Sequence, residues 1–127
     1  MRAINASAAF NAWLGLEVAA AAPGEVELRL GSRPDFGQYA GFLHAGIIGG
    51  LIDTACGFAA ATVAGRVLAS HYSVNCLTPA VGEAFVVRGR VLRAGRRQIF
   101  AQAELFGLRG GVEKLAATGE TILMPAE

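Results

Sequence analysis

The order of polar and apolar residues along the chain changes character twice. Residues 25–30 alternate strictly between polar and apolar side chains, which is typical of a half-buried strand. From about Phe42 to Gly65 apolar residues follow one another without alternation, over too many positions for a single strand. This run predicts one long buried helix. A shorter helix is expected over about Ala3 to Trp13, and the Gly/Pro-rich segment 31–41 is expected to be a loop.

Strand-like patterns return after the long helix. They cover residues 67–77, 84–92, 99–108 and 112–123. Turn residues separate them, and the connections are short, so the pattern predicts an antiparallel meander. Gly46, Gly50, Gly57 and Ala61 recur on one face of the helix, where small residues allow another backbone to approach closely. The order of elements predicts an α+β fold in which one central helix is wrapped by one antiparallel sheet.

Length and composition predict a single domain over residues 1–127 with an unusually apolar surface. Hydrophobic residues make up 54% of the chain and charged residues 17%, which excludes an intrinsically disordered chain and exceeds what a small soluble monomer needs. The excess predicts a contact between subunits or with a membrane. Asp53 lies near the centre of the apolar segment, where a carboxylate costs about 2.5–3.5 kcal/mol on insertion, so we favour the subunit contact. Polar residues interrupt any N-terminal signal sequence, and we expect a cytoplasmic protein.

Charge and cysteine content exclude several other classes. A net charge of +1 provides no field that would attract nucleic acid. The two cysteines, Cys56 and Cys76, form no disulfide scaffold, and the sequence has no CxxC motif or Cys/His cluster for zinc. We interpret both cysteines as packing residues and expect no metal site.

Two residues of the helical region are candidates for chemistry. Asp53 has almost entirely apolar neighbours, so its charged form loses hydration and is costly without a partner. The alternative is a structural carboxylate held by backbone or water. His44 stands at the expected start of the helix, where unpaired N–H groups can bind an anion or a polarised carbonyl, or where it is a plain capping residue. Nine residues rotate a helix by about 900°, which places the two on opposite sides and predicts a site made from two chains.

Three motifs occur in order along the chain. They are Gln38-x5-His44-Ala45-Gly46-x6-Asp53, the segment 73–80 (SVNCLTPA) and Gly95-Arg96-Arg97. Together they resemble the signature of hotdog-fold acyl-CoA thioesterases of the phenylacetate-degradation (PaaI) type, from about Leu14 to Leu123. The resemblance implies a hotdog fold, in which a long central helix is wrapped by a curved antiparallel sheet. It also implies a homodimer that pairs into a dimer of dimers, and thioester hydrolysis without a cofactor.

The resemblance also implies a role for each motif position. Asp53 would act as general base or nucleophile, and the N–H of Ala45 would bind the thioester oxygen. His44 would orient backbone and substrate, Gln38 would orient the thioester or the water, and Gly46 would contact substrate. The family usually has glycine where this chain has Ala45. The family also has a serine or threonine on the strand that follows the helix. The matching position in this chain is Ala69, so Ser70, one residue away, is an auxiliary candidate.

A basic cluster completes the set of candidates. Arg93, Gly95, Arg96 and Arg97 lie in or near the last motif, and the arginines form the densest basic cluster of the chain together with Arg88 and Arg90. We interpret the cluster as contacts for the phosphates of coenzyme A, with solvent-facing charges as the alternative. Aromatic and medium-chain acyl groups both fit the sequence. A non-catalytic acyl-CoA binding or sensor module on the same fold is the alternative function.

Overall fold

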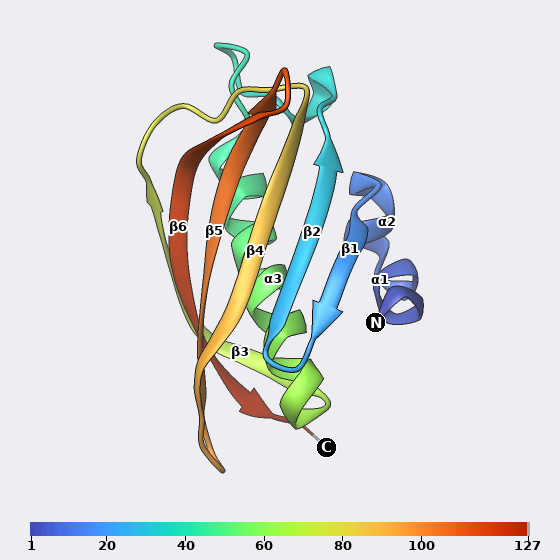
Figure 1. Ribbon diagram of the computed structural model, residues 1–127, viewed down its shortest axis with the longest axis vertical. Helices are drawn as coiled ribbons and strands as arrows, with labels where there is room; N and C mark the ends of the chain where they lie inside the picture. Colours follow the sequence, from blue (N-terminus) through green and yellow to red (C-terminus); the bar gives the residue numbers. More distant parts are fainter. Residues whose placement is uncertain (127) are drawn as a thin grey trace.

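The computed structural model describes residues 1–126 as helices and strands joined by short loops (Figure 1). The elements are α1 (Arg2–Ser7), α2 (Ala9–Leu14), β1 (Glu17–Ala22), β2 (Glu25–Gly31), the 3₁₀ turn η1 (Pro34–Phe36), α3 (Ala45–Ala64), β3 (Val67–Cys76), β4 (Ala84–Ala94), β5 (Ile99–Arg109) and β6 (Val112–Pro125).

All six strands form one antiparallel sheet in the order β1-β2-β4-β5-β6-β3. The sheet curves around α3, which packs against its concave face (Figure 1). This arrangement confirms the predicted fold class, a long central helix wrapped by a curved antiparallel sheet. By length and composition alone α3 would suit a membrane span, but here it is the core helix of the fold.

The predicted four-strand meander is wrong at its first strand. β3 pairs with β6 at the far edge of the sheet, and only β4, β5 and β6 follow one another as neighbours. The segment 77–83 then crosses the end of the sheet to reach β4. The N–H of Leu77 bonds the carbonyl of Ala116 in β6, and the N–H of Glu83 bonds the carbonyl of Leu108 in β5. These bonds attach both ends of the crossing segment to the sheet.

Three element boundaries also differ from the sequence prediction. α3 begins at Ala45 rather than near residue 42, because the N–H groups of Leu43 and His44 bond the carbonyls of Ala80 and Phe36 instead of continuing a helix. The N-terminal helix is two helices, interrupted at Ala8, which is extended. β1 was not predicted, because its alanine-rich sequence does not alternate.

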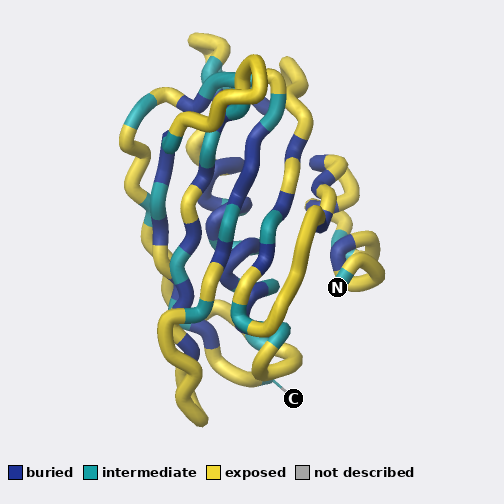
Figure 2. The backbone as a smooth tube through the Cα atoms, in the orientation of Figure 1, coloured by how far each residue is buried: buried dark blue, intermediate teal, exposed yellow. Residues whose placement is uncertain are grey.

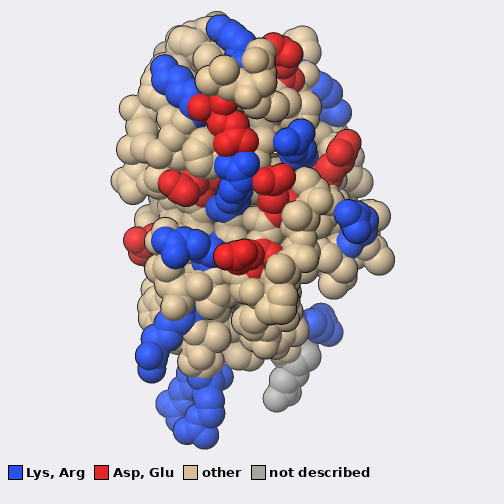
Figure 3. Space-filling view, in the orientation of Figure 1, with Lys and Arg blue, Asp and Glu red and all other residues tan. Residues whose placement is uncertain are grey.

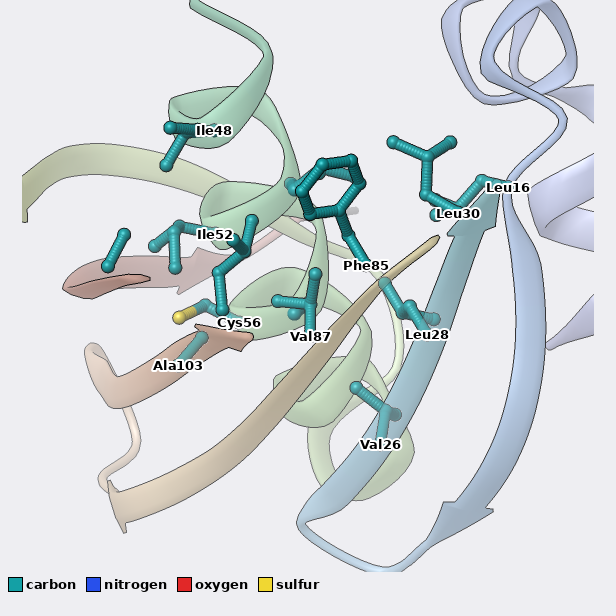
Figure 4. Close-up of a cluster of buried hydrophobic side chains, with 14 of the residues drawn as sticks. Leu16, Val26, Leu28, Leu30, Ile48, Ile52, Cys56, Phe85, Val87 and Ala103 are labelled. Carbon is teal, nitrogen blue, oxygen red and sulfur yellow. The ribbon is translucent and has the colours of Figure 1, made fainter. Parts of the chain in front are cut away.

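The core lies between α3 and the concave face of the sheet (Figures 2 and 4). Close approach of the two layers depends on glycines in the strands, not on those of the helix. A Cβ on Gly89 would lie 2.6 Å from the carbonyl oxygen of Ala55, and a Cβ on Gly119 would lie 2.6 Å from Cγ2 of Ile52. Gly50 and Gly57 of α3 instead face Phe10 and Leu123.

Candidate active site

The start of α3 presents one free backbone donor. His44 is the N-cap residue, and its Nδ1 accepts a 2.8 Å hydrogen bond from the N–H of Gly46. Gly46 leaves room for this ring, since a Cβ there would lie 3.0 Å from Nδ1. The N–H of Ala45 has no acceptor within residues 1–126, and His44, Ala45 and Gly46 are all exposed. This N–H is therefore available to an anion or a carbonyl oxygen, at the positive end of a 20-residue helix.

Gln38 holds the turn that leads into this helix start. Its backbone N–H donates to the carbonyl of Phe42 at 2.8 Å, and its own carbonyl accepts from Gly41 at 3.0 Å. The side-chain oxygen accepts from the N–H of Ala40. The side-chain NH₂ is the part of Gln38 left to contact another molecule, and it can only donate.

Asp53 lies in the middle of α3 with a carboxylate that the chain leaves unsatisfied. Its Oδ1 is buried and has no hydrogen-bond partner in the described part of the chain. Burial raises the pKa of this carboxyl above its ordinary value. Such a group needs a proton, a water, a ligand or a second chain to complete its surroundings.

One chain does not bring Asp53 and the helix start together. Eight residues separate Ala45 from Asp53, which amounts to about 12 Å along the helix axis. A base and an oxyanion donor that act on one thioester must each lie within hydrogen-bond reach of it, at about 3 Å. His44 itself precedes the helix in an extended conformation, so the predicted 180° relation between His44 and Asp53 does not hold. The axial distance gives the stronger argument for a site made from two chains.

Ser70 occupies a β-bulge in β3. The register with β6 shifts between Ala69 and His71, and the Ser70 hydroxyl donates to the carbonyl oxygen of Ile122 at 3.2 Å. The bulge breaks the period-two alternation that would otherwise place Ala69 and Ser70 on opposite faces. The hydroxyl proton of Ser70 is therefore already used in a hydrogen bond within the sheet.

The predicted basic residues lie at the tip of the β4–β5 hairpin. Gly95 closes the turn through a 2.8 Å bond from its N–H to the carbonyl of Gln98. Arg93, Arg96 and Arg97 are exposed and form no ion pair with any described residue. Figure 3 shows basic side chains at this end of the molecule, opposite the start of α3 in Figure 1. For Arg88 the predicted phosphate contact is wrong, because Glu27 and Glu113 bind its guanidinium on the convex face of the sheet.

The two cysteines differ in their surroundings. Cys56 is fully buried, and burial is the main cause that raises the pKa of its thiol to about 11, which fits the predicted packing role. Cys76 is exposed at the end of β3, so it does not pack within the core of the single chain.

Two further residues that contact α3 were not identified from the sequence. Thr121 of β6 lies against the Cys56 thiol of α3, and its Oγ1 is buried without a hydrogen-bond partner among residues 1–126. Tyr72 of β3 pairs with it across the strands and packs its ring against Gly49 of α3. The alternation of side chains along β6 could have identified Thr121 as a buried residue, because it lies on the same face of the strand as the core residue Leu123.

Comparison with known proteins places this geometry in a family. The sequence matches the thioesterase superfamily over residues 40–114, which include the helix start, Asp53, Ser70 and the arginine hairpin. No curated protein matches the sequence.

Solved structures share the whole fold. A thioesterase family protein from Silicibacter pomeroyi is 37% identical, with a TM-score of 0.93 over 97% of this chain and 93% of that one. Zebrafish thioesterase superfamily member 2 is 25% identical, with a TM-score of 0.85 over 97% and 91%. The E. coli PaaI protein from the phenylacetic acid degradation operon is 17% identical, with a TM-score of 0.87 over 98% and 89%, and shows likeness of fold alone. The chain belongs to the thioesterase superfamily and has its hotdog fold.

Proposed function

We propose that the protein hydrolyses acyl-CoA thioesters to a free acid and coenzyme A, as a PaaI-like enzyme acting on aromatic or medium-chain acyl groups. The observation that carries the proposal is Asp53, a half-buried carboxylate with an unpartnered Oδ1, in the central helix of a thioesterase-superfamily fold. A carboxylate left in this state costs stability, and catalysis gives it a use.

Each proposed role follows from a group that is free to act. Asp53 takes a proton from the water that attacks the thioester carbon, and the C–S bond then breaks to release coenzyme A. Alternatively, Asp53 attacks that carbon itself, coenzyme A leaves, and water hydrolyses the resulting mixed anhydride to the free acid and Asp53. Negative charge then develops on the carbonyl oxygen, where the free N–H of Ala45 donates to it; loss of one such donor typically reduces the rate by about 10²–10³. The Gln38 NH₂ and the His44 ring position the substrate at the same helix start.

We further propose that two chains pair through β3. This strand is ten residues long and ends the sheet, and most of its residues are exposed, including Leu68. Such an edge is a template for pairing with another strand. A two-fold axis makes the two β3 strands antiparallel and reverses the ends of the molecule. The partner's helix start then lies at the end where this chain carries its arginine hairpin (Figure 1).

This dimer would combine groups that one chain keeps apart. Asp53 of one chain would act with the Ala45 N–H of the other, and Arg93, Arg96 and Arg97 would bind the coenzyme A phosphates. We also propose, from the PaaI-like resemblance, that dimers pair into tetramers and that the enzyme is cytoplasmic.

Release of free thiol from a panel of phenylacetyl-, benzoyl- and fatty acyl-CoA thioesters tests the proposal. We expect turnover of at least one member by the parent and a loss of at least about 100-fold in Asp53→Asn, whose amide keeps the volume but accepts no proton. Size-exclusion chromatography and circular dichroism check that the variant keeps its assembly and fold. Activity of Asp53→Asn within tenfold of the parent would remove Asp53 from the mechanism.

A non-catalytic acyl-CoA binding module is the second candidate. Two observations favour it: Ala45 replaces the usual glycine beside the proposed donor, and the Ser70 hydroxyl is already engaged with Ile122. Under this alternative, isothermal titration shows acyl-CoA binding while no panel member releases thiol.

A further inference from the structure

Two consecutive glycines of α3 each receive an aromatic ring from a different part of the fold. A Cβ on Gly49 would lie 3.5 Å from Cε2 of Tyr72, and a Cβ on Gly50 would lie 3.1 Å from the ring of Phe10. Phe10 belongs to α2, on the β1 side of the molecule, and Tyr72 belongs to β3 at the opposite edge, with α3 between them (Figure 1). The two rings therefore flank the same turn of α3.

By helical geometry, Asp53 points between the two glycines that these rings contact. At about 100° per residue, the direction of Asp53 lies about 40° from that of Gly49 and about 60° from that of Gly50, inside the 100° sector between them. Side chains in a helix also lean toward its N-terminus, so the carboxylate of Asp53 leans over the turn that holds the two glycines. By this geometry the carboxylate faces the gap between the Phe10 ring and the Tyr72 ring.

Both rings keep apolar surface uncovered. Phe10 is 44% exposed and Tyr72 is 51% exposed. Trp13 extends the Phe10 side, with its ring centroid 6.3 Å from that of Phe10, and Arg33 holds Trp13 in place by donating to its carbonyl oxygen at 2.8 Å. Aromatic surface on both sides of an unpartnered carboxylate is suited to a flat apolar group that reaches toward that carboxylate.

We propose that Phe10 and Tyr72 determine acyl specificity, as the two walls of a slot in front of Asp53 that selects acyl groups with a flat ring near the thioester. A ring placed in the slot contacts aromatic surface on both of its faces. A linear alkyl chain leaves part of the Phe10 ring and part of the Tyr72 ring exposed to water. Aromatic pairs are worth about 0.5–1.5 kcal/mol beyond area burial, so one lost wall corresponds to about a two- to tenfold change in selectivity. This inference rests on the proposed thioesterase function and names its substrate class.

The test compares kcat/KM for phenylacetyl-CoA and benzoyl-CoA with kcat/KM for hexanoyl-CoA and octanoyl-CoA. We expect the parent to prefer the ring-bearing substrates, and the preference to fall about two- to tenfold in Phe10→Leu and in Tyr72→Leu. Tyr72→Phe keeps the ring and should keep the preference. Phe100→Leu is the matched control, since Phe100 is 37% exposed and its register partners Arg93 and Ile122 put it on the convex face of the sheet.

Gly50→Ala provides a test that keeps both rings. Its new Cβ would lie 3.1 Å from the Phe10 ring and displace it by a few tenths of an ångström. A smaller loss of preference than in Phe10→Leu is expected, because the ring is shifted and not removed. This variant serves if thermal melts show that Phe10→Leu does not fold.

Each other outcome overturns a stated part of the inference. A parent that prefers linear acyl groups, or a preference unchanged in both leucine variants, refutes the slot while thiol release still supports thioesterase activity. A uniform loss of kcat in Tyr72→Phe for every substrate would assign Tyr72 to chemistry through its hydroxyl instead. A parent that releases thiol from no substrate refutes the proposed function and this inference together.

Discussion

At the scale of single residues, the site is marked by what remains unpaired. Asp53 Oδ1 and Thr121 Oγ1 are buried without hydrogen-bond partners in residues 1–126. Because burial raises the pKa of Asp53, the native state holds its proton more tightly than the unfolded chain does. The native state therefore loses stability as pH rises from the ordinary carboxyl pKa to the raised one. A residue that costs stability at neutral pH suits a functional role better than a structural one.

The raised pKa of Asp53 predicts the acidic side of the pH profile. A general base or nucleophile must be ionised, so kcat/KM of the free enzyme should increase with pH through the pKa of Asp53. The midpoint should lie above 3.8, the value for an ordinary aspartate, because desolvation disfavours the charged form. Initial rates from pH 4 upward, in buffers of constant ionic strength, measure it. A profile that is flat down to pH 4 on a folded enzyme would contradict this role for Asp53.

The sequence indicated Asp53, His44 and the free helix start because each follows from local pattern: an isolated carboxylate in an apolar run and a glycine-bounded helix start. Tyr72 and Thr121 gave no such signal. Their position near α3 depends on β3 and β6 being neighbours, which is a pairing between strands about fifty residues apart. Local periodicity carries no information about that pairing.

At the scale of elements, the existence and type of the long helix and five strands were predictable, and their edges were not. The start of α3 is set by tertiary bonds from Leu43 and His44, and β1 lacks the alternation that identifies a strand. The placement of β3 was also missed, because a short connection favours neighbouring strands and the crossing segment 77–83 is an exception. The order of strands determines which strand forms a free edge of the sheet. The proposed dimer contact, at the edge formed by β3, therefore could not be predicted from the sequence.

The close approach of sheet and helix predicts a strong effect of Gly89→Ala. The added methyl group would overlap the carbonyl of Ala55 in α3 at 2.6 Å, and backbone on both sides leaves no flexible group to move. Overpacking of this kind costs about 1–3 kcal/mol, measured as a lower free energy of unfolding in urea. Gly31→Ala is the control, because a Cβ there meets nothing within 4 Å and β2 should keep its stability. Equal stability of the two variants would show that the layers are less tightly packed than described.

The arginines of the β4–β5 hairpin are expected to affect KM for acyl-CoA and not kcat. Arg96 and Arg97 are exposed at its tip, so replacing both with alanine should raise KM for acyl-CoA with little change in kcat, the pattern for lost uniform binding. A pantetheine thioester, which lacks the nucleotide, should be hydrolysed equally by parent and double variant. A fall in kcat at constant KM would instead assign these arginines to the transition state.

At the scale of the whole molecule, one chain holds the parts of the proposed site at separate places. The free N–H of Ala45 lies at the start of α3, the carboxylate of Asp53 about 12 Å further along it, and the arginines at the opposite end of the sheet. The sequence predicted a site from two chains through helical phase, which fails because His44 precedes the helix. The argument for the proposed two-chain site is instead the length of helix between Ala45 and Asp53. We propose the unpaired edge of β3 as the two-fold contact that joins the parts.

Subunit exchange between two inactive variants tests the two-chain site. Asp53→Asn removes the carboxylate, and Ala45→Pro removes the donor N–H at the first helical position, where proline is tolerated. His44 is already extended at φ −64° and ψ 135°, the conformation that a residue before proline prefers, so the helix start should survive. A mixed dimer then carries one site with both defects and one site with neither. Mixing should therefore restore up to about half the parental rate per mixed dimer, by site counting on a two-fold axis. Native mass spectrometry counts the mixed dimers, and each variant incubated alone is the control. Mixed dimers without recovered activity would place the carboxylate and the donor of each site in the same chain.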